Sequence, residues 1–175
     1  ADGERVEFDA GGTKVKLSPT VDLEVVVPAS VAARATSSSG DVSATGAFSG
    51  AVMNTSFGKV SVTGTRGDVD ARTSSGAVDV SDVSGSRVEA QSSFGAVRVS
   101  KLIAARVIAK SSSGEVTCDG GGKGEYELTT SFGAVRLHGG NGSAHAQSQS
   151  GRVEVTGFDG KVVAHSDFGG VEVAG

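Results

Sequence analysis

Apolar and polar residues alternate along this chain in short stretches, and the arrangement repeats eight times. In each repeat the alternation runs for a few residues, stops at a glycine, and resumes after it with the opposite parity. A period of two residues indicates a half-buried β-strand rather than an amphipathic helix. Each repeat is therefore predicted to form two short strands joined by a bend at the glycine.

The bend glycine recurs every 18 or 19 residues, and positions within a repeat are counted from it as position zero. Position +2 is a valine in every repeat, and position −5 is an alanine, methionine or leucine. Repeats of two strands bury their apolar residues by stacking on one another. The eight glycines are Gly40, Gly58, Gly76, Gly95, Gly114, Gly133, Gly151 and Gly169, and the valines are Val42, Val60, Val78, Val97, Val116, Val135, Val153 and Val171.

This regularity predicts an all-β fold, a parallel β-solenoid (single-chain β-helix) of about eight two-strand coils with 18–19 residues per coil. At about 4.8 Å per coil the stack is roughly 38 Å long, and right-handed coiling is expected. Residues 34–175 are predicted to form the solenoid. Residues 1–33 depart from the repeat and are predicted to form an N-terminal β cap with a strand at 21–27, all within one structural domain.

Three further structural features are predicted at or near the bends. Glycine at position zero is predicted to supply backbone angles that a tight corner demands. Val52 lies where other repeats place a polar residue, which indicates a bulge or a shorter turn in the second coil. A second, glycine-rich bend is predicted between successive coils, at Gly46, Gly64, Gly85, Gly120, Gly139 and Gly157.

Position −1 alternates strictly between serine and phenylalanine. The order along the chain is Ser39, Phe57, Ser75, Phe94, Ser113, Phe132, Ser150 and Phe168. Large residues stacked over small ones fill an internal column without voids, so the rings are predicted to point inward. An exposed row of rings that docks a partner is the alternative. The serine or threonine at position −3 is predicted to point inward and to hydrogen-bond the backbone or its neighbours.

The stretch "DLEVVVPASVAARATSSSGDVSATG", followed by repeats such as "TSSGAVDV", resembles the bacterial β-strand-repeat adhesin family of unknown function. That family overlaps the toast-rack domains of envelope-stress proteins. The resemblance runs from about Asp22 to the end of the chain. It implies a β-solenoid in or outside the bacterial cell envelope, and it brings no catalytic residues with it.

No catalytic, cofactor-binding or metal-binding residue is predicted, so we expect the protein not to be an enzyme. Cys118 replaces an inward aliphatic residue and is expected to pack as a small hydrophobe. His138, His145 and His165 are expected at the solvated surface, because no acidic residue joins them at metal-ligand spacing. The net charge of −4 with mixed signs argues against nucleic acid, and no apolar run is long enough to span a membrane.

Three surface features favour structural roles over binding. A sugar-binding or sugar-cleaving protein needs aromatic platforms, but tryptophan is absent and Tyr126 is the single tyrosine. The outward serines at position −2 resemble an ice-binding face, but the neighbouring column holds bulky residues (Arg72, Gln91, Lys110 and His165). Outward charges are expected to pair between coils, Asp79 with Arg98 and Arg136 with Glu154.

The leading functional hypothesis is a non-catalytic structural or adhesin-like surface scaffold. The alternative is an envelope-stress sensor or ligand-binding module of the bacterial cell envelope, with an envelope protein or a glycan as partner. The last coil is expected to expose Phe168, Val171 and Val173 as an interaction surface. Because open coil ends invite pairing, we expect either that the natural chain continues beyond Gly175 or that this end is covered by self-association through the C-terminal coil, as a filament or a dimer. The expected location is the cell envelope or outside the cell.

Overall fold

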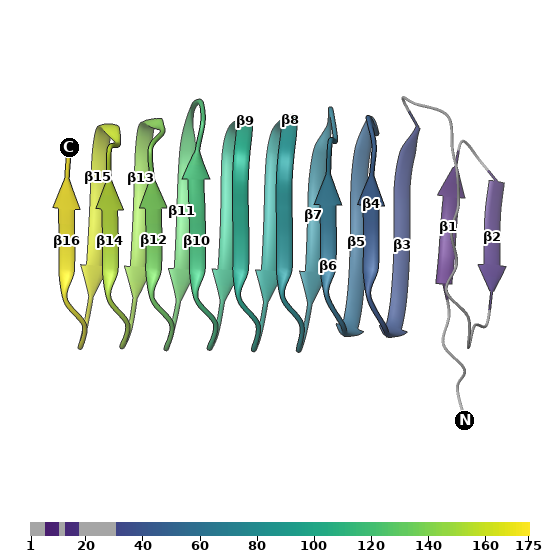
Figure 1. Ribbon diagram of the computed structural model, residues 1–175, viewed down its shortest axis with the longest axis horizontal. Coiled ribbons are helices and arrows are strands. Elements are labelled where there is room, and N and C mark those ends of the chain that lie inside the picture. The colour runs from purple at the N-terminus through teal and green to yellow at the C-terminus, as the bar shows by residue number, and fades with distance from the viewer. Residues whose placement is uncertain (1–5, 11–12, 18–30) are drawn as a thin grey trace.

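The computed structural model describes residues 6–10, 13–17 and 31–175. In these residues the chain forms strands and bends and no helix. The strands stack along one axis, and the purple N-terminal and yellow C-terminal strands lie at opposite ends of the stack (Figure 1). The predicted all-β parallel solenoid of about eight coils is confirmed.

Within the described residues, 14 parallel strands form one sheet wound into two layers. Layer A precedes each position-zero glycine and contains β3 (Ala32–Ser39), β5 (Gly50–Phe57), β7 (Asp68–Thr73), β11 (Lys123–Thr130), β13 (Asn141–Ser148) and β15 (Asp159–Ser166). Layer B follows it and contains β4 (Val42–Thr45), β6 (Val60–Thr63), β10 (Val116–Gly120), β12 (Val135–His138), β14 (Val153–Thr156) and β16 (Val171–Ala174). Two longer strands, β8 (Val78–Ser92) and β9 (Val97–Ser111), contribute to both layers.

The core consists of columns that run the length of the stack. The position +2 valines pair in unbroken register from Val42 to Val171. Seven of these eight valines are at most 7% exposed, and Val171, in the last coil, is 46% exposed. Alanines fill most of the facing position −5 column, for example Ala71, Ala90 and Ala109, and Met53 and Leu128 occupy it in the second and sixth coils. The predicted valine stack is confirmed.

The position-zero glycines are required by space rather than by backbone angle. Among the eight, Gly40 alone has a positive φ, of +122°. A Cβ atom on any of the other seven would lie 1.7–2.1 Å from the carbonyl oxygen of the preceding coil's glycine. The bends lie directly over one another at the strand spacing of about 4.8 Å, so a side chain there would enter the neighbouring backbone. The expectation that these glycines supply special backbone angles is wrong for seven coils.

The inward hydroxyl groups at position −3 connect successive bends, as predicted. From the second coil onward, each donates to the carbonyl oxygen of the preceding coil's glycine at 2.8–3.0 Å. From Thr73 onward each also accepts from the N–H of its own coil's glycine, at 2.8–3.3 Å. We call this set the hydroxyl ladder: Thr55, Thr73, Ser92, Ser111, Thr130, Ser148 and Ser166. It satisfies backbone groups that the bends would otherwise leave unpaired.

The second bend turns at position +6, where a left-handed backbone conformation recurs. Glycine occupies it with positive φ in four coils, at Gly46, Gly64, Gly139 and Gly157. The third and fourth coils place Asp82 and Lys101 there instead, with φ of 54° and 52°. Gly85, which the sequence suggested for this bend, lies inside β8, three residues beyond Asp82.

The extra residue of the 19-residue third coil enters after this bend. In layer B the residues of neighbouring coils pair 18 apart, as in Val60 with Val78, but in layer A Val69 pairs with Val88. The backbone N–H groups of Ser86 and Arg87 both donate to Oδ1 of Asp68, at 2.9 Å each. The carboxylate therefore takes the hydrogen bonds that the shifted backbone cannot make.

The expected irregularity at Val52 is absent. Strands β3 and β5 keep one register through this point, with Val52 opposite Arg34. Its neighbours Ala51 and Met53 are buried, and Val52 itself lies on the outer, half-exposed side of β5. The valine is simply an apolar residue on the outer face.

Replacing Lys101 with glycine should stabilise the protein by about 0.5–1 kcal/mol. A left-handed conformation costs a residue with a Cβ about 1–2 kcal/mol, and the flexibility of glycine in the unfolded chain offsets part of that gain. Lys101→Ala is the matched control, because it removes the same side chain and keeps the strained angle. Urea denaturation that shows no gain of Lys101→Gly over Lys101→Ala would contradict this explanation.

Part of the predicted N-terminal cap is described. Strands β1 (Val6–Ala10) and β2 (Thr13–Leu17) pair antiparallel, and β1 lies next to β3 at the first coil (Figure 1). The predicted strand at 21–27 lies outside the described residues.

Candidate interaction surfaces

Four phenylalanines at position −1 form a row on the outside of the solenoid. Phe57, Phe94, Phe132 and Phe168, which we call the phenylalanine row, are 66–82% exposed. The expectation that they point inward is wrong. The hydroxyl at position −3 is the last inward side chain before the bend, and beyond it the backbones of adjacent coils pack against each other. No interior space remains for a ring, so the alternative of an exposed row is the one observed.

The backbone holds this row in place. The N–H groups of Phe94 and Phe132 donate to the position −2 carbonyl oxygens of the preceding coil, both at 3.1 Å, and that of Phe168 does so at 2.9 Å. The intervening serines at position −1 are exposed as well. Since phenylalanine occurs in every second coil, successive rings are about 9.6 Å apart along the axis. The rings therefore project at regular intervals from a fixed edge.

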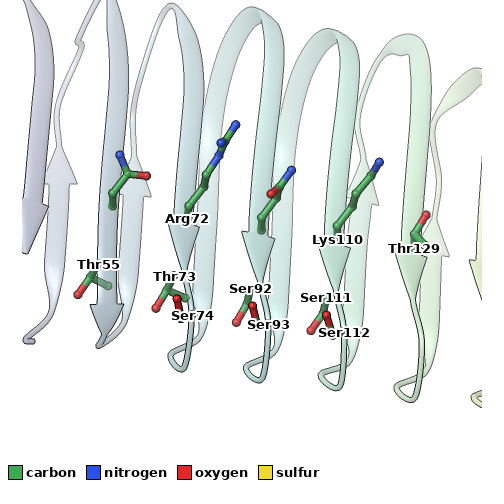
Figure 2. A pocket seen from close by; sticks show the side chains of 12 residues that line it. Thr55, Arg72, Thr73, Ser74, Ser92, Ser93, Lys110, Ser111, Ser112 and Thr129 are labelled. Carbon is green, nitrogen blue, oxygen red and sulfur yellow. The ribbon is translucent and has the colours of Figure 1, made fainter. Parts of the chain in front are cut away.

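A shallow groove lies on the outer side of layer A. Its volume is about 510 Å³, and polar side chains of β5, β7, β8, β9 and β11 line it. Figure 2 shows the position −2 and −3 hydroxyl groups of three coils near the bend, with Arg72 and Lys110 further along the strands. Gln91 stands between these two cations in the same column. The position −3 hydroxyls already donate within the hydroxyl ladder, so the groove presents the position −2 hydroxyls, the Gln91 amide and the two cations in a regular array.

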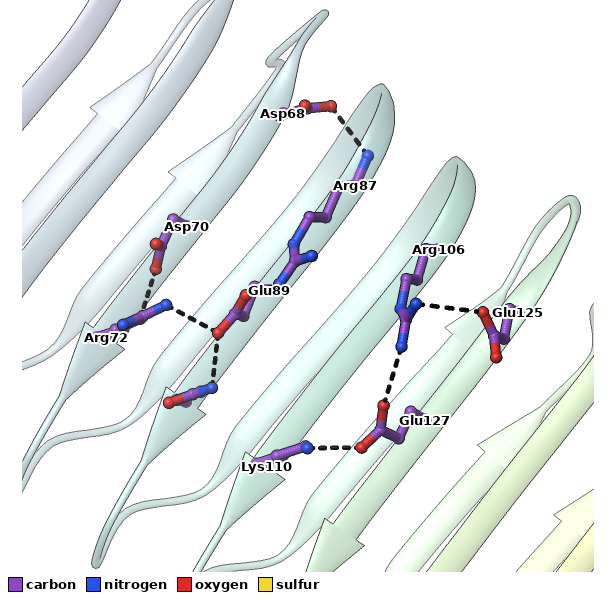
Figure 3. Close-up of polar contacts among 10 residues, drawn as sticks. Asp68, Asp70, Arg72, Arg87, Glu89, Arg106, Lys110, Glu125 and Glu127 are labelled. Carbon is purple, nitrogen blue, oxygen red and sulfur yellow. Dashed lines mark hydrogen bonds and ion pairs between the residues drawn. The ribbon is translucent and has the colours of Figure 1, made fainter.

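Ion pairs beside the groove neutralise its cations (Figure 3). Glu89 is only 8% exposed and accepts from Arg72 Nη2 at 2.8 Å, from Gln91 Nε2 at 2.7 Å, and from Arg87. Glu127 pairs with Lys110 at 2.5 Å. The expected pairs on layer B are also present, Asp79 with Arg98 at 3.9 Å and Arg136 with Glu154 at 3.7 Å.

The two paired glutamates make stability depend on acid pH. The hydrogen bond from Arg87 holds the pKa of Glu89 below its ordinary value of 4.5, and the bond from Lys110 does the same for Glu127. A lowered folded-state pKa gives stability that is complete above the unfolded value and is lost as pH falls through the folded value. The free energy of unfolding should therefore decrease below about pH 4.5.

Glu89→Gln should weaken that dependence and lower stability at neutral pH, because Arg72 and Arg87 lose their common carboxylate. Urea denaturation of both proteins from neutral pH down to about pH 3, across the range of glutamate titration, measures the effect. An unchanged pH profile in Glu89→Gln would show that this carboxylate does not carry the dependence.

The cysteine and the histidines are placed as expected. Cys118 is buried, and burial raises the pKa of its thiol to about 12, so the thiol is protonated. The three histidines are exposed. His138 contacts the Thr156 hydroxyl at 3.0 Å, and His165 contacts Asp167 at 2.9 Å. His145 is level with Val163. No three histidine, cysteine or acidic residues in the described ranges lie together as a metal site.

Tyr126 belongs to the core and is not a surface platform. It is fully buried, and its hydroxyl donates to the carbonyl oxygen of Gly122 at 2.7 Å. Its ring meets that of Phe158 edge to face, with 5.7 Å between centroids. This aromatic pair fills the second bend near β11, and the sequence repeat gave no sign of it.

The last coil exposes the residues that the sequence singled out. Phe168 is 82% exposed, Val171 46% and Val173 54%. The seventh-coil counterparts of Val171 and Val173, which are Val153 and Val155, are fully buried. In the described part of the chain, β16 pairs with β14 alone, and β15 pairs with β13 alone.

The fold and these surfaces define a β-solenoid repeat scaffold. The family model described as Toastrack DUF4097 matches residues 47–173, and the chain belongs to that family, whose function is unknown. Searches of curated proteins and of solved structures gave no match. Over the described residues, no helix is long and apolar enough to cross a membrane.

Proposed function

We propose that this protein is a non-catalytic, adhesin-like surface scaffold of the bacterial cell envelope, and that it associates through its C-terminal coil. The observation that carries the proposal is the exposed apolar end of the core at Val171 and Val173, next to valines that are fully buried one coil earlier. The buried, protonated Cys118 thiol and the separated histidines support a role without catalysis.

Two geometries of association follow from this surface. The two ends of a solenoid differ, so a head-to-tail contact repeats without closing and builds a filament. A contact between two C-terminal coils is related by a two-fold axis and stops at a dimer. In either arrangement the valine columns become continuous and the free edges of β15 and β16 gain partners.

Val173→Lys tests the contact, because it places a charge where two apolar columns meet. We expect this variant to lose self-association in sedimentation and to lose any filaments seen by electron microscopy. Val163→Lys is the matched control, since it adds the same charge to an exposed valine on the outer face of the same coil. A wild-type protein without self-association, or equal association of both variants, would overturn the end contact.

The groove in layer A favours a second candidate function, a ligand-binding or sensor module of the envelope. Its hydroxyl groups and its Gln91, Arg72 and Lys110 side chains suit a polar ligand such as an envelope glycan. Ser93→Trp should block the groove and abolish binding on an array of bacterial glycans. Ser61→Trp, on the outer side of layer B, is the control and should bind like the wild type. No glycan bound by the wild type would exclude glycans as this ligand.

A further inference from the structure

The phenylalanine row has a pattern that a second copy of the same chain can complete. Position −1 is exposed in all eight coils, and its residues follow the order Ser, Phe, Ser, Phe, Ser, Phe, Ser, Phe from the first coil to the last. Each ring therefore stands between two small side chains, and the row is a regular series of projections and gaps along one edge.

We propose that two copies of this chain pair along this edge in antiparallel orientation, with each phenylalanine of one copy lying in a serine gap of the other. A two-fold axis perpendicular to the row reverses the order of coils in the second copy. Because the row has eight members in strict alternation, the reversed order puts Phe opposite Ser at every position. A parallel arrangement in the same register would instead put Phe against Phe and Ser against Ser.

The spacing favours a second copy over an unrelated partner. The gaps recur at two coil spacings, about 9.6 Å, and the backbone hydrogen bonds between coils fix them. A partner that fills all of them needs projections with the same repeat. A second copy has that repeat because it has the same coils, and it presents gaps for the rings of the first.

The surface on both sides of the row is compatible with close approach. At position +1, on one side, Ala77, Ala96 and Ala134 are small and partly buried. At position −2, on the other side, most coils have serine. Three of the four charged residues at position +1 already have charged partners on layer B: Lys59 pairs with Asp79, Glu115 with Arg136, and Arg152 with Glu172. The fourth, Asp41 in the first coil, accepts a hydrogen bond from the backbone N–H of Lys59 at 2.7 Å. The contact thus buries rings beside charges that already have an ion-pair or hydrogen-bond partner.

The area is sufficient for a specific dimer. A phenylalanine buries about 150–250 Å² when it is covered completely. The four rings are 66–82% exposed, so the eight rings of a dimer remove roughly 1,000 Å² from water, which reaches the lower limit for a specific interface. Serine and alanine contacts beside the rings add to this area. This contact shares Phe168 with the surface of the last coil but uses neither Val171 nor Val173, so it stands independently of the end-to-end association.

The test uses two complementary double variants in a Val173→Lys background, which removes the end contact. Phe94→Ser/Phe132→Ser deletes two projections, and Ser75→Phe/Ser113→Phe fills two gaps. All four positions are exposed and already hold the introduced residue in other coils. Both variants should therefore melt within a few degrees of the Val173→Lys parent.

The parent protein should sediment as a dimer at about 100 μM, where a micromolar association is nearly complete. Each double variant alone should lose at least about 10-fold in dimer affinity, the first for lack of rings and the second because rings oppose rings. An equimolar mixture, with one variant fluorescently labelled, should recover heterodimers, since the added rings of one face the added serines of the other.

Each alternative gives a different result. Nonspecific adhesion of apolar surface would make Ser75→Phe/Ser113→Phe dimerise more tightly than its parent, and this would overturn the proposal. A mixture of the two double variants that stays monomeric would overturn the proposal that each phenylalanine lies opposite a serine of the other copy. A monomeric parent at the same concentration would also overturn it and would assign the row to a different partner.

Discussion

Replacing Gly95 with alanine is expected to destabilise the solenoid by about 3 kcal/mol or more. The added Cβ would lie 1.8 Å from the carbonyl oxygen of Gly76 and 2.3 Å from its carbonyl carbon. These are backbone atoms of the neighbouring coil, so the contact can be relieved only by separating two stacked bends. The separation would break the hydrogen bonds of the hydroxyl ladder on both sides.

The direction of this change in the free energy of unfolding is informative. Replacing glycine with alanine in a strand normally stabilises a protein by about 0.5–1 kcal/mol, because alanine loses less conformational freedom on folding. Gly50→Ala is the matched control. Gly50 has an ordinary backbone angle, and its nearest neighbour would be the Asp68 carbonyl oxygen at 3.4 Å. Urea denaturation should show Gly50→Ala near wild-type stability. Similar values for the two variants would mean that close approach of the bends does not determine the glycine row.

Ser111→Ala is expected to cost about 2 kcal/mol, through hydrogen bonds rather than packing. The Ser111 hydroxyl donates to the carbonyl oxygen of Gly95 at 3.0 Å and accepts from the N–H of Gly114 at 2.9 Å. Ser111 is buried, so alanine would leave a backbone donor and a backbone acceptor without partners in the bend. Such groups carry the full cost of their lost hydration.

Ser111→Thr distinguishes the contribution of the hydroxyl group to stability from that of side-chain packing, because it keeps the hydroxyl and changes the rest of the side chain. Threonine already occupies this ladder position at Thr73 and Thr130, with the same two bonds. We expect Ser111→Thr to keep stability within about 0.5 kcal/mol of the wild type. Amide exchange should also be faster at Gly114 in the alanine variant and unchanged in the threonine variant. Equal loss in both variants would attribute the effect to packing.

The sequence allowed the inner columns to be predicted because they repeat at a fixed distance from the glycine. Valine at +2 and hydroxyl at −3 occur in every coil, and a core position in a stacked solenoid must be filled in each coil. The orientation at position −1 could not be obtained in the same way. The residues from −2 to +1 lie in the bend, where the strand alternation that assigns inward and outward sides no longer holds.

The role of the bend glycine was also hidden in the sequence. A glycine needed for its backbone angle and a glycine needed for its lack of a Cβ look identical in a sequence. The two are distinguished by the 1.7–2.1 Å that would separate an added Cβ from the glycine carbonyl oxygen of the preceding coil. The charge cluster at Glu89 was missed for a different reason. It joins Arg72 of one coil to Arg87 and Gln91 of the next, and because Arg72, Arg87 and Glu89 stand at different positions of the repeat, no single column of the sequence displays the cluster.

The hydroxyl ladder has a direction, and this bears on how the protein is made. Every donor in it points from a later coil to the glycine carbonyl of the coil before it. A ribosome releases the earlier coil first, at about 5–20 residues per second. Each new coil therefore emerges when its acceptor already exists, and it can be added to a finished template within seconds. Synthesis from the N-terminus and growth of the stack proceed in the same order.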